Sequence, residues 1–325
     1  MKYTIFGESH GPAIGVTLTG APAGLVLDLD FIRSELERRR PGQNALSTAR
    51  NEADEPEILS GVFEGKTTGT PLCAIIRNGD TRSRDYSRLK ICPRPSHGDY
   101  AGNVRYEGCN DYRGGGHFSG RLTAPLVFAG AVAKLILRER GIDVSSRISM
   151  VEGVEDPAPE QVEKLVLAAK AEGDSVGGAI ACAVTGLPAG RGAPDFGCNV
   201  EGIFSQYLFA VPAVKAVAFG AGFGFAHMRG SQANDPFYMD DGRVKTRTNH
   251  AGGVNGGITN GMPVTFEVAI RPTPSISKEQ DTVNLETGED AKLTIHGRHD
   301  PCIVHRAVPV IESAAALAAC EVLGI

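Results

Sequence analysis

Residues 111–121, with the sequence DYRGGGHFSGR, combine residue types that favour anion binding. Three consecutive glycines lie between two arginines, and an apolar run typical of a helix, TAPLVFAGAVAKLIL, begins directly afterwards. A glycine loop that leads into a helix presents backbone N–H groups and the positive end of the helix dipole to a ligand. The segment therefore predicts an anion site. It lacks the Gly-Lys-Ser/Thr ending of the usual nucleotide P-loop.

Three short histidine-bearing segments are candidates for proton transfer. FGESHG contains His10, RPSHGD contains His97, and GRHDPC contains His299 and Asp300. Each segment is polar and contains glycine or proline, as functional loops often do. An imidazole titrates near neutral pH, so it can donate or accept a proton with little tuning. By pattern alone, each of these histidines is more often a surface or packing residue. The sequence contains neither H-x-x-x-H nor H-E-x-x-H, so no metal site is expected.

Arginines in and near the glycine-rich loops form a second candidate set. A helix C-terminus favours arginine, which explains part of the RRR run at 38–40. That explanation does not cover four arginines placed beside glycine or proline: Arg94, Arg113, Arg121 and Arg298. Guanidinium groups bind phosphate and carboxylate through paired hydrogen bonds, so an anionic ligand is expected. RPTPSIS at 271–277 suits a phosphate, although a strand end followed by a polyproline turn explains it equally well.

Strands and helices are expected to position these loops. AIGVTLTG at 13–20 and AIACAVTG at 179–186 predict strands. One helix should begin near Asp28 and end at Pro41 and Gly42, and a second should cover 124–140. A third should have Pro159 near its first turn, and VPVIESAAALAACEVL predicts a C-terminal helix. The residues alone indicate an α+β protein.

A faint internal repeat divides the chain into two halves. LTGAPAGL at 18–25 is similar to VTGLPAGR at 184–191, and GKTTGTPLCAIIR at 65–77 is similar to GITNGMPVTFEVAIR at 257–271. The shared order predicts an internal duplication within a single domain, with pseudo-symmetric halves at about 1–150 and 151–325. The alternative is that T-G-x-P-x-G is only a common strand-and-turn pattern.

Composition limits the class of protein. The chain has 325 residues, a net charge of −5, 42% hydrophobic and 22% charged residues, which is ordinary for a globular protein and argues against general nucleic-acid binding. Seven cysteines without a C-x-x-C pair indicate reduced thiols in the cytoplasm. No signal peptide is visible, and the apolar run at 123–137, interrupted by Lys134, is expected to be too short to cross a membrane.

Eight motifs together resemble the chorismate synthase family, in the family's order from residue 3 to about residue 323. They are TIFGESHGPAIGV, RRRPGQ, LSGVFEGKTTGTP, DYRGGGHFSGR, MRGSQAND, TNHAGGVNGGITNG, RPTPSIS and GRHDPCIVHRAVPVIE. The resemblance implies conversion of 5-enolpyruvylshikimate 3-phosphate to chorismate and phosphate. The reaction is an anti 1,4-elimination that needs reduced FMN without net redox change.

The resemblance also implies a fold and an assembly. The expected fold is a β-α-β sandwich with sheets outside and helices inside, and the expected assembly is a homotetramer with one flavin per subunit. No reductase domain is visible in the sequence, which favours reduction of FMN by NAD(P)H through an external flavin reductase.

Roles for individual residues follow only from the resemblance. His10 would protonate the departing phosphate, His97 would stabilise the anionic reduced flavin, and Asp300 would support removal of the ring proton near flavin N5. The residues that match substrate-binding positions are Ser9, Arg39, Arg94 and Arg121. Those that match FMN-binding positions are His117, Phe118, Ser119, Ala213, Gly256, Arg271, Pro272, Thr273, Pro274, Ser275 and Arg298.

The glycine loop departs from the family pattern. GGGHFSGRLT stands where the family usually has GGGRSSARET, so that His117, Phe118 and Leu122 replace arginine, serine and glutamate. If His117 faces an anion, ligand binding should weaken as pH rises through its pKa; the alternative is that its ring packs beside Phe118 away from the ligand. Ala45 replaces another family arginine; either Arg50 compensates for it, or one anion contact is weaker.

Two further classes of function stay open from the sequence. A paralogue that binds flavin without turnover would fit the altered loop, but retention of His10, His97 and Asp300 counts against it. A pyridine-nucleotide oxidoreductase would need a G-x-G-x-x-G segment between a strand and a helix, and the sequence has none.

Overall fold

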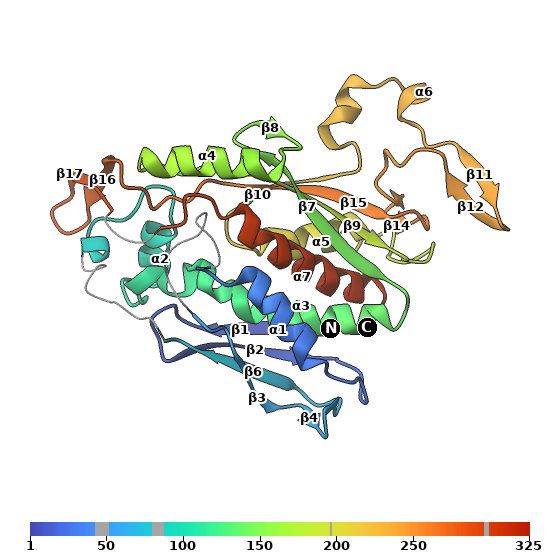
Figure 1. Cartoon of the computed structure of the whole chain (residues 1–325), viewed down its shortest axis with the longest axis horizontal. Helices are drawn as coiled ribbons and strands as arrows, with labels where there is room; N and C mark the ends of the chain where they lie inside the picture. The colour runs from blue at the N-terminus through green and yellow to red at the C-terminus, as the bar shows by residue number, and fades with distance from the viewer. Residues whose placement is uncertain (43–51, 80–87, 196, 296–298) are drawn as a thin grey trace.

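The computed structural model describes residues 1–42, 52–79, 88–195, 197–295 and 299–325. Two antiparallel sheets enclose a layer of helices, as Figure 1 shows. This arrangement confirms the predicted α+β class and the β-α-β sandwich with its helices inside.

The first sheet comes from the N-terminal part of the chain. Its strand order is β1 (Lys2–Gly7), β2 (Ala13–Thr19), β6 (Leu72–Arg77) and β3 (Pro56–Ser60), all paired antiparallel. The hairpin β4 (Val62–Phe63) and β5 (Lys66–Thr67) follows β3. Alternate residues of β6 are buried, as expected for a strand that covers a core with one face.

The second sheet comes from the C-terminal part. Its order is β10 (Val214–Phe219), β15 (Val264–Ile270), β9 (Gly178–Thr185), β7 (Asp143–Val151) and β8 (Val154–Glu155). Helix α4 (Pro159–Ala171), with the expected proline in its first turn, lies above this sheet in the view of Figure 1.

Four helices fill the middle layer: α1 (Leu29–Arg39), α3 (Thr123–Arg138), α5 (Val200–Phe209) and α7 (Val304–Val322). The Asp28 side chain accepts a hydrogen bond from the Phe31 backbone and so begins α1. Helices α3 and α7 pack closely, because a methyl group on Gly130 of α3 would overlap with Ser313 of α7. The four predicted helices and two predicted strands are therefore confirmed, with ends shifted by a few residues.

A buried ion network explains the lysine that interrupts the apolar run. Lys134 of α3 pairs with Glu35 of α1 and with Glu312 of α7, 2.6 Å from the latter. Arg38 donates two hydrogen bonds to Glu312, at 2.7 and 2.9 Å. The run is longer than expected: Gly120–Arg138 is long and apolar enough to cross a membrane, but 89% of it is buried inside the protein.

The two sheets have the same internal order. Strands β1, β2, β6 and β3 of the first sheet correspond in sequence and in pairing to β7, β9, β15 and β10 of the second. Helices also follow in matching places, with α1 and α5 after the second strand and α3 and α7 after the fourth. The pattern is what a duplication would require; the two-half division stays a prediction.

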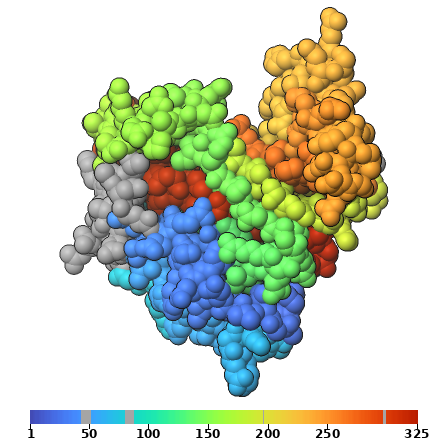
Figure 2. Space-filling model, turned by 45° about the vertical axis from the view of Figure 1, so that its right-hand side comes forward, coloured from blue at the N-terminus to red at the C-terminus, as the bar shows by residue number. Residues whose placement is uncertain are grey.

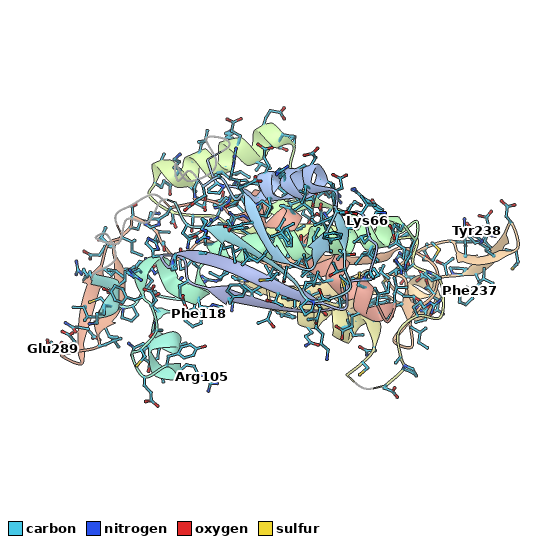
Figure 3. The ribbon with its side chains drawn as sticks, turned by 90° about the horizontal axis from the view of Figure 1, so that it is seen from below. Lys66, Arg105, Phe118, Phe237, Tyr238 and Glu289 are labelled. Atoms are coloured by element: carbon cyan, nitrogen blue, oxygen red, sulfur yellow. The ribbon has the colours of Figure 1, made fainter. Side chains whose placement is uncertain are left out.

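The remaining elements lie outside the two sheets and the four core helices. They are α2 (Asp99–Arg105), η2 (Arg113–Phe118), η3 (Gly120–Leu122), η4 (Gly222–His227), α6 (Gly230–Ala233) and the pairs β11 (Phe237–Asp240) with β12 (Arg243–Thr246), β13 (Val254–Asn255) with β14 (Ile258–Thr259), and β16 (Gln280–Asn284) with β17 (Glu289–Leu293). The segment from η4 to β12 projects from the body in Figures 1 and 2. In Figure 3, Tyr238 and Glu289 mark opposite ends of the molecule.

Candidate active site

A cavity of about 250 Å³ lies between the two halves, where both core helices begin. Gly120, Arg121 and Thr123 line it at the start of α3, and Ile303 and Arg306 line it at the start of α7. The N-terminus of a helix carries unpaired backbone N–H groups and partial positive charge. Two such ends at one cavity favour a negatively charged ligand.

The glycine run of the sequence forms one side of this cavity and requires glycine at each position. Gly114, Gly115 and Gly116 have φ of 60°, 84° and 52°, a conformation that other residues rarely adopt. A methyl group on Gly114 would overlap with the His10 ring, and one on Gly116 would overlap with the Asp111 carbonyl. The run therefore serves to bring backbone close to two functional segments.

Ser9 and His10 lie behind this run. Their exposed fractions are 0% and 8%, and the Ser9 backbone donates a hydrogen bond to the Gly116 carbonyl at 3.1 Å. The Ser9 hydroxyl makes no hydrogen bond with the residues that the structure describes. Neither residue lines the cavity, whereas Gly114, against which both pack, does.

Arg39 and Arg121 form a wall of the cavity and share one carboxylate. Arg39 donates to Asp54 through Nε at 3.1 Å, and Arg121 also pairs with Asp54. Arg121 Nε donates to the Asn78 side chain at 3.1 Å. Burial lowers the pKa of Arg39 to about 10, although Asp54 opposes the change. Burial alone would raise the pKa of Asp54, but the two arginines hold it below its usual value. We call Arg39, Asp54 and Arg121 the paired wall.

Arg94 and His97 are held by a single carboxylate on α2. Asp99 accepts hydrogen bonds from Arg94 Nε at 2.7 Å and from Arg94 Nη2 at 2.8 Å, and it lies 2.6 Å from His97 Nδ1. This short contact assigns the proton to Nδ1, although Arg94 Nη2 lies 3.1 Å from the same nitrogen. Burial lowers the pKa of His97, and Asp99 partly opposes the change, so the free protein holds a neutral imidazole.

Polar groups without partners gather on another part of the lining. The Arg271 side chain makes no hydrogen bond or ion pair with any described residue. Its pKa is lowered mainly by burial and to a lesser extent by the positive charge of Arg94. Thr273 Oγ1 and His299 Nε2 are buried and also lack hydrogen-bond partners among the described residues. Burial and Arg94 lower the pKa of His299. We call Arg271, Thr273 and His299 the open wall.

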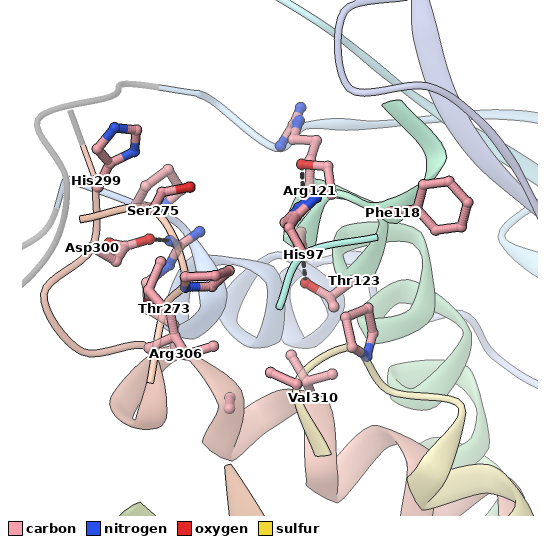
Figure 4. A pocket seen from close by; sticks show the side chains of 18 of the residues that line it. His97, Phe118, Arg121, Thr123, Thr273, Ser275, His299, Asp300, Arg306 and Val310 are labelled. Carbon is pink, nitrogen blue, oxygen red and sulfur yellow. Dashed lines mark hydrogen bonds and ion pairs between the residues drawn. The ribbon is translucent and has the colours of Figure 1, made fainter. Parts of the chain in front are cut away.

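Asp300 lies next to the open wall and is held by an arginine of α7. Its carboxylate pairs with Arg306, and Figure 4 shows the two side chains pointing toward each other. Arg306 Nε also donates to the Arg39 carbonyl at 3.0 Å, which ties the end of α1 to the start of α7. The adjacent His305 is largely buried, and burial lowers its pKa to about 4.

Phe118 lies across the cavity from His299 in Figure 4. A methyl group on Gly98 or Gly102 would overlap with its ring, and the ring centroid lies 6.3 Å from that of Tyr106. Helix α2 thus holds this aromatic side chain at the cavity through two small residues. The ring lines the cavity.

The structure brings most of the predicted residues to this cavity, but not all. Those that line it are Arg39, Arg94, His97, Phe118, Ser119, Arg121, Ala213, Arg271, Pro272, Thr273, Pro274, Ser275 and Asp300. His117 is exposed, and its Nδ1 lies 3.0 Å from the Gly7 carbonyl, so the expected position facing an anion is not what the structure shows. Gly256 lies in the β13–β14 turn and does not line the cavity. Arg298, Ala45 and Arg50 lie outside the described residues.

Sequence reasoning missed the acidic partners of the arginines. Just before β3, the buried residues Glu52 and Asp54 alternate with exposed residues, and Glu52 lines the cavity. The third acidic residue, Asp99, follows His97 by two positions. The acidic residues in these short segments were the available signal, because buried arginines need negatively charged partners. Arg306 lies in the motif GRHDPCIVHRAVPVIE together with Asp300, but the pairing of the two side chains was not expected.

Together these features define an enzyme site for a small ligand that carries several negative charges. A family model for chorismate synthase matches residues 1–323, and the chain belongs to the chorismate synthase family. Its activity is therefore that of the family, the step from 5-enolpyruvylshikimate 3-phosphate to chorismate in the shikimate pathway.

Individual relatives agree with this assignment. The chorismate synthases of Methanothermobacter thermautotrophicus and Thermococcus kodakarensis are each 46% identical to the chain over 97% of its length, and the matches cover 90% and 94% of those proteins. The chain is also similar to a solved structure titled "Crystal Structure of Chorismate Synthase", with 27% identity and a TM-score of 0.76. That match covers 99% of this chain and 91% of the other.

Proposed function

We propose that the chain carries out this step as an anti 1,4-elimination, with reduced FMN bound in the cavity. The open wall is the observation that carries the cofactor proposal. A buried polar atom without a partner costs about 1–3 kcal/mol. Among the described residues, Arg271 has no ionic partner, and Thr273 and His299 each have one such atom. A flavin carries carbonyl oxygens, ring nitrogens and a phosphate, which are the partners that these groups lack.

The residues that would hold the cofactor come from the segment after β15 and from the glycine loop. Arg271, Thr273 and Ser275 offer a cation and two hydroxyls. Phe118 lies at the other side of the cavity (Figure 4), and the next residue, Ser119, also lines it. When bound, reduced FMN supplies the electron density that assists loss of the substrate phosphate.

Substrate anions would be held by Arg94 and by the arginines of the paired wall. Each guanidinium is already fixed by a carboxylate, so little conformational entropy is lost when an anion binds. His10 would donate a proton to an oxygen of the departing phosphate. It lies against Gly114, whose missing side chain keeps the imidazole close to the cavity. Asp300, held by Arg306, would support removal of the ring proton, and neutral His97 would accept a hydrogen bond at Nε2.

An anaerobic assay tests the proposal. The purified protein is given reduced FMN and 5-enolpyruvylshikimate 3-phosphate, and the release of phosphate and chorismate is followed. Turnover with reduced FMN, and none with oxidised FMN or without flavin, is the expected result. Turnover that is independent of the flavin would contradict the cofactor part of the proposal.

We further propose a cytoplasmic homotetramer that receives reduced FMN from an external system driven by NAD(P)H. The projecting segment supports assembly, since Phe223, Phe237 and Met239 on it are exposed to 87%, 68% and 66%. Gly256 does not line the cavity of its own chain, so any contact of Gly256 with the cofactor would come from a neighbouring subunit. Light scattering of the purified chain tests the tetramer directly.

A further inference from the structure

Two acidic side chains point inward just before strand β3 of the first sheet. Glu52 and Asp54 are each 3% exposed, whereas Ala53 and Glu55 between and after them are exposed. Asp54 has a φ of 52°, a left-handed conformation that aspartate tolerates better than most residues. The local backbone thus buries both acids while the residues beside them stay exposed.

The Asp54 carboxylate lies behind the two arginines rather than in the cavity. Arg39 and Arg121 line the cavity, and Asp54 does not. The side chains of Arg39, Asp54 and Arg121 are exposed to only 1%, 1% and 4%. A carboxylate has about four acceptor sites, enough to bind two guanidinium groups at once. Two buried cations so close together need such a counter-ion, because each would otherwise be desolvated and repelled.

We propose that Asp54 is a positioning residue, which fixes the guanidinium groups of Arg39 and Arg121 so that their remaining N–H groups face an anionic ligand. The inference rests on the proposed function, since it names the residue that prepares the substrate-binding arginines. Because both arginines keep Asp54 ionised, the clamp is present at neutral pH.

The surroundings show what Arg121 would do without this clamp. Glu52 lines the cavity, and its carboxylate lies 3.6 Å from Arg121 Nη2. The Arg77 carbonyl lies 3.4 Å from the same nitrogen. Removal of the Asp54 charge would let Arg121 turn toward Glu52. The Glu52 carboxylate would then pair with the guanidinium N–H groups that otherwise face the cavity. An anionic ligand should then bind more weakly, even though the site has gained net positive charge.

The test compares Asp54→Asn and Asp54→Glu with the parent protein. Binding of 5-enolpyruvylshikimate 3-phosphate is measured by calorimetry without flavin, and inorganic phosphate is measured in parallel as a simpler probe. We expect Asp54→Asn to raise the substrate dissociation constant at least tenfold. In the anaerobic assay KM should rise by a similar factor and kcat should change less.

The matched control is Glu57→Gln. Glu57 pairs with Arg77 on the outer face of the same sheet, at 3.0 Å, and both side chains are exposed. The dissociation constant of the Glu57→Gln variant for 5-enolpyruvylshikimate 3-phosphate should stay within twofold of the parent value. Asp54→Glu keeps the charge but moves the carboxylate by one methylene group. It should therefore fold and still bind the substrate several-fold more weakly, which preserves the test if Asp54→Asn does not fold.

A double variant separates positioning from general destabilisation. The double variant carries both Asp54→Asn and Arg121→Lys. If Asp54 acts through Arg121, the fold increase in its dissociation constant will be well below the product of the fold increases in the two single variants. Multiplicative effects, an unchanged dissociation constant in a folded Asp54 variant, or tighter binding by Asp54→Asn would each overturn the inference. If the parent binds phosphate but not the substrate, the proposed function fails, and the phosphate measurements still decide the role of Asp54.

Discussion

The paired wall and the open wall line the same cavity but meet their polar requirements differently. In the paired wall two buried arginines share the single carboxylate of Asp54, and Asn78 accepts a further hydrogen bond from Arg121. In the open wall Arg271, Thr273 and His299 have no side-chain partner among the described residues. The first comes mainly from the N-terminal half of the chain and the second from the C-terminal half.

The difference indicates when each wall is completed. A buried charge pair is assembled during folding, and loss of one partner strands the other at a cost of about 3–5 kcal/mol. Unpartnered polar groups weaken the free protein and gain their partners only when a ligand arrives. The paired wall should therefore govern both stability and binding, and the open wall should govern binding alone.

The largest expected effect lies behind the glycine run, at His10. We expect His10→Ala to fold and to lower turnover by about 10²–10⁴, the usual range for a lost general acid. Phosphate release under anaerobic conditions measures it, with His117→Ala as the control because that histidine is exposed and lies outside the cavity. Turnover within threefold of the parent would remove His10 from the mechanism.

The contrast between the walls is tested by Arg121→Ala and Arg271→Ala. Arg121→Ala leaves Asp54 paired with Arg39 alone and takes a hydrogen-bond donor from Asp54 and Asn78, so it should lower the free energy of unfolding by about 1–3 kcal/mol. Arg271→Ala removes an unpaired cation and should lower it by less than about 1 kcal/mol, while weakening ligand binding. Urea unfolding followed by circular dichroism measures both, and equal losses of stability would break the comparison.

Acid should destabilise the C-terminal half through its buried histidines. Burial lowers the pKa of His305 to about 4 and also lowers the pKa of His299, so the unfolded chain takes up protons first as pH falls. The free energy of unfolding should then decrease as pH falls from about 6.5 toward 4, by up to about 3 kcal/mol for His305.

His305→Phe should flatten this part of the pH profile. The pKa values of the carboxylates paired with arginines are lowered, so these groups stop stabilising the folded state only below about pH 4. Between about pH 4 and 6.5, the change in the free energy of unfolding therefore comes mainly from histidines. Thermal unfolding at several pH values is the measurement. A variant profile as steep as that of the parent would exclude His305 as the source.

The smallest effect is expected at His117, which is on neither wall. Because its ring lies against the Gly7 carbonyl at the surface, His117→Arg should change FMN affinity less than threefold between pH 5.5 and 8.5. Fluorescence titration of FMN measures this. A flatter pH profile for the variant than for the parent would show that the histidine reaches the ligand after all.

Much of this structure could be predicted because local rules act strongly in it. Strands at 13–20 and 179–186 follow from β-branched and apolar runs between glycines, and Asp28 and Pro159 mark helix starts through capping and fixed φ. The predicted order of a glycine loop followed by a helix is also present, since Gly114, Gly115 and Gly116 come shortly before α3.

Pairings between distant segments could not be predicted in this way. Asp54 meets Arg121 across 67 positions, and Arg38 meets Glu312 across 274. Such contacts depend on how the two halves pack, which no local pattern encodes. The contact of His117 could not be predicted for a similar reason, since the Gly7 carbonyl near its Nδ1 belongs to β1, far away in the sequence.

The close crossing of α3 and α7 has a consequence for motion. Gly130 lets Ser313 approach the α3 backbone, and almost every residue of both helices is buried around that crossing. Backbone amides in such a pair open only in rare, large unfolding events, so they should exchange with deuterium more slowly than those of the projecting segment from η4 to β12. The two positive helix ends at the cavity would then hold still on the timescale of turnover, and adjustments to the ligand would fall to the segments around them.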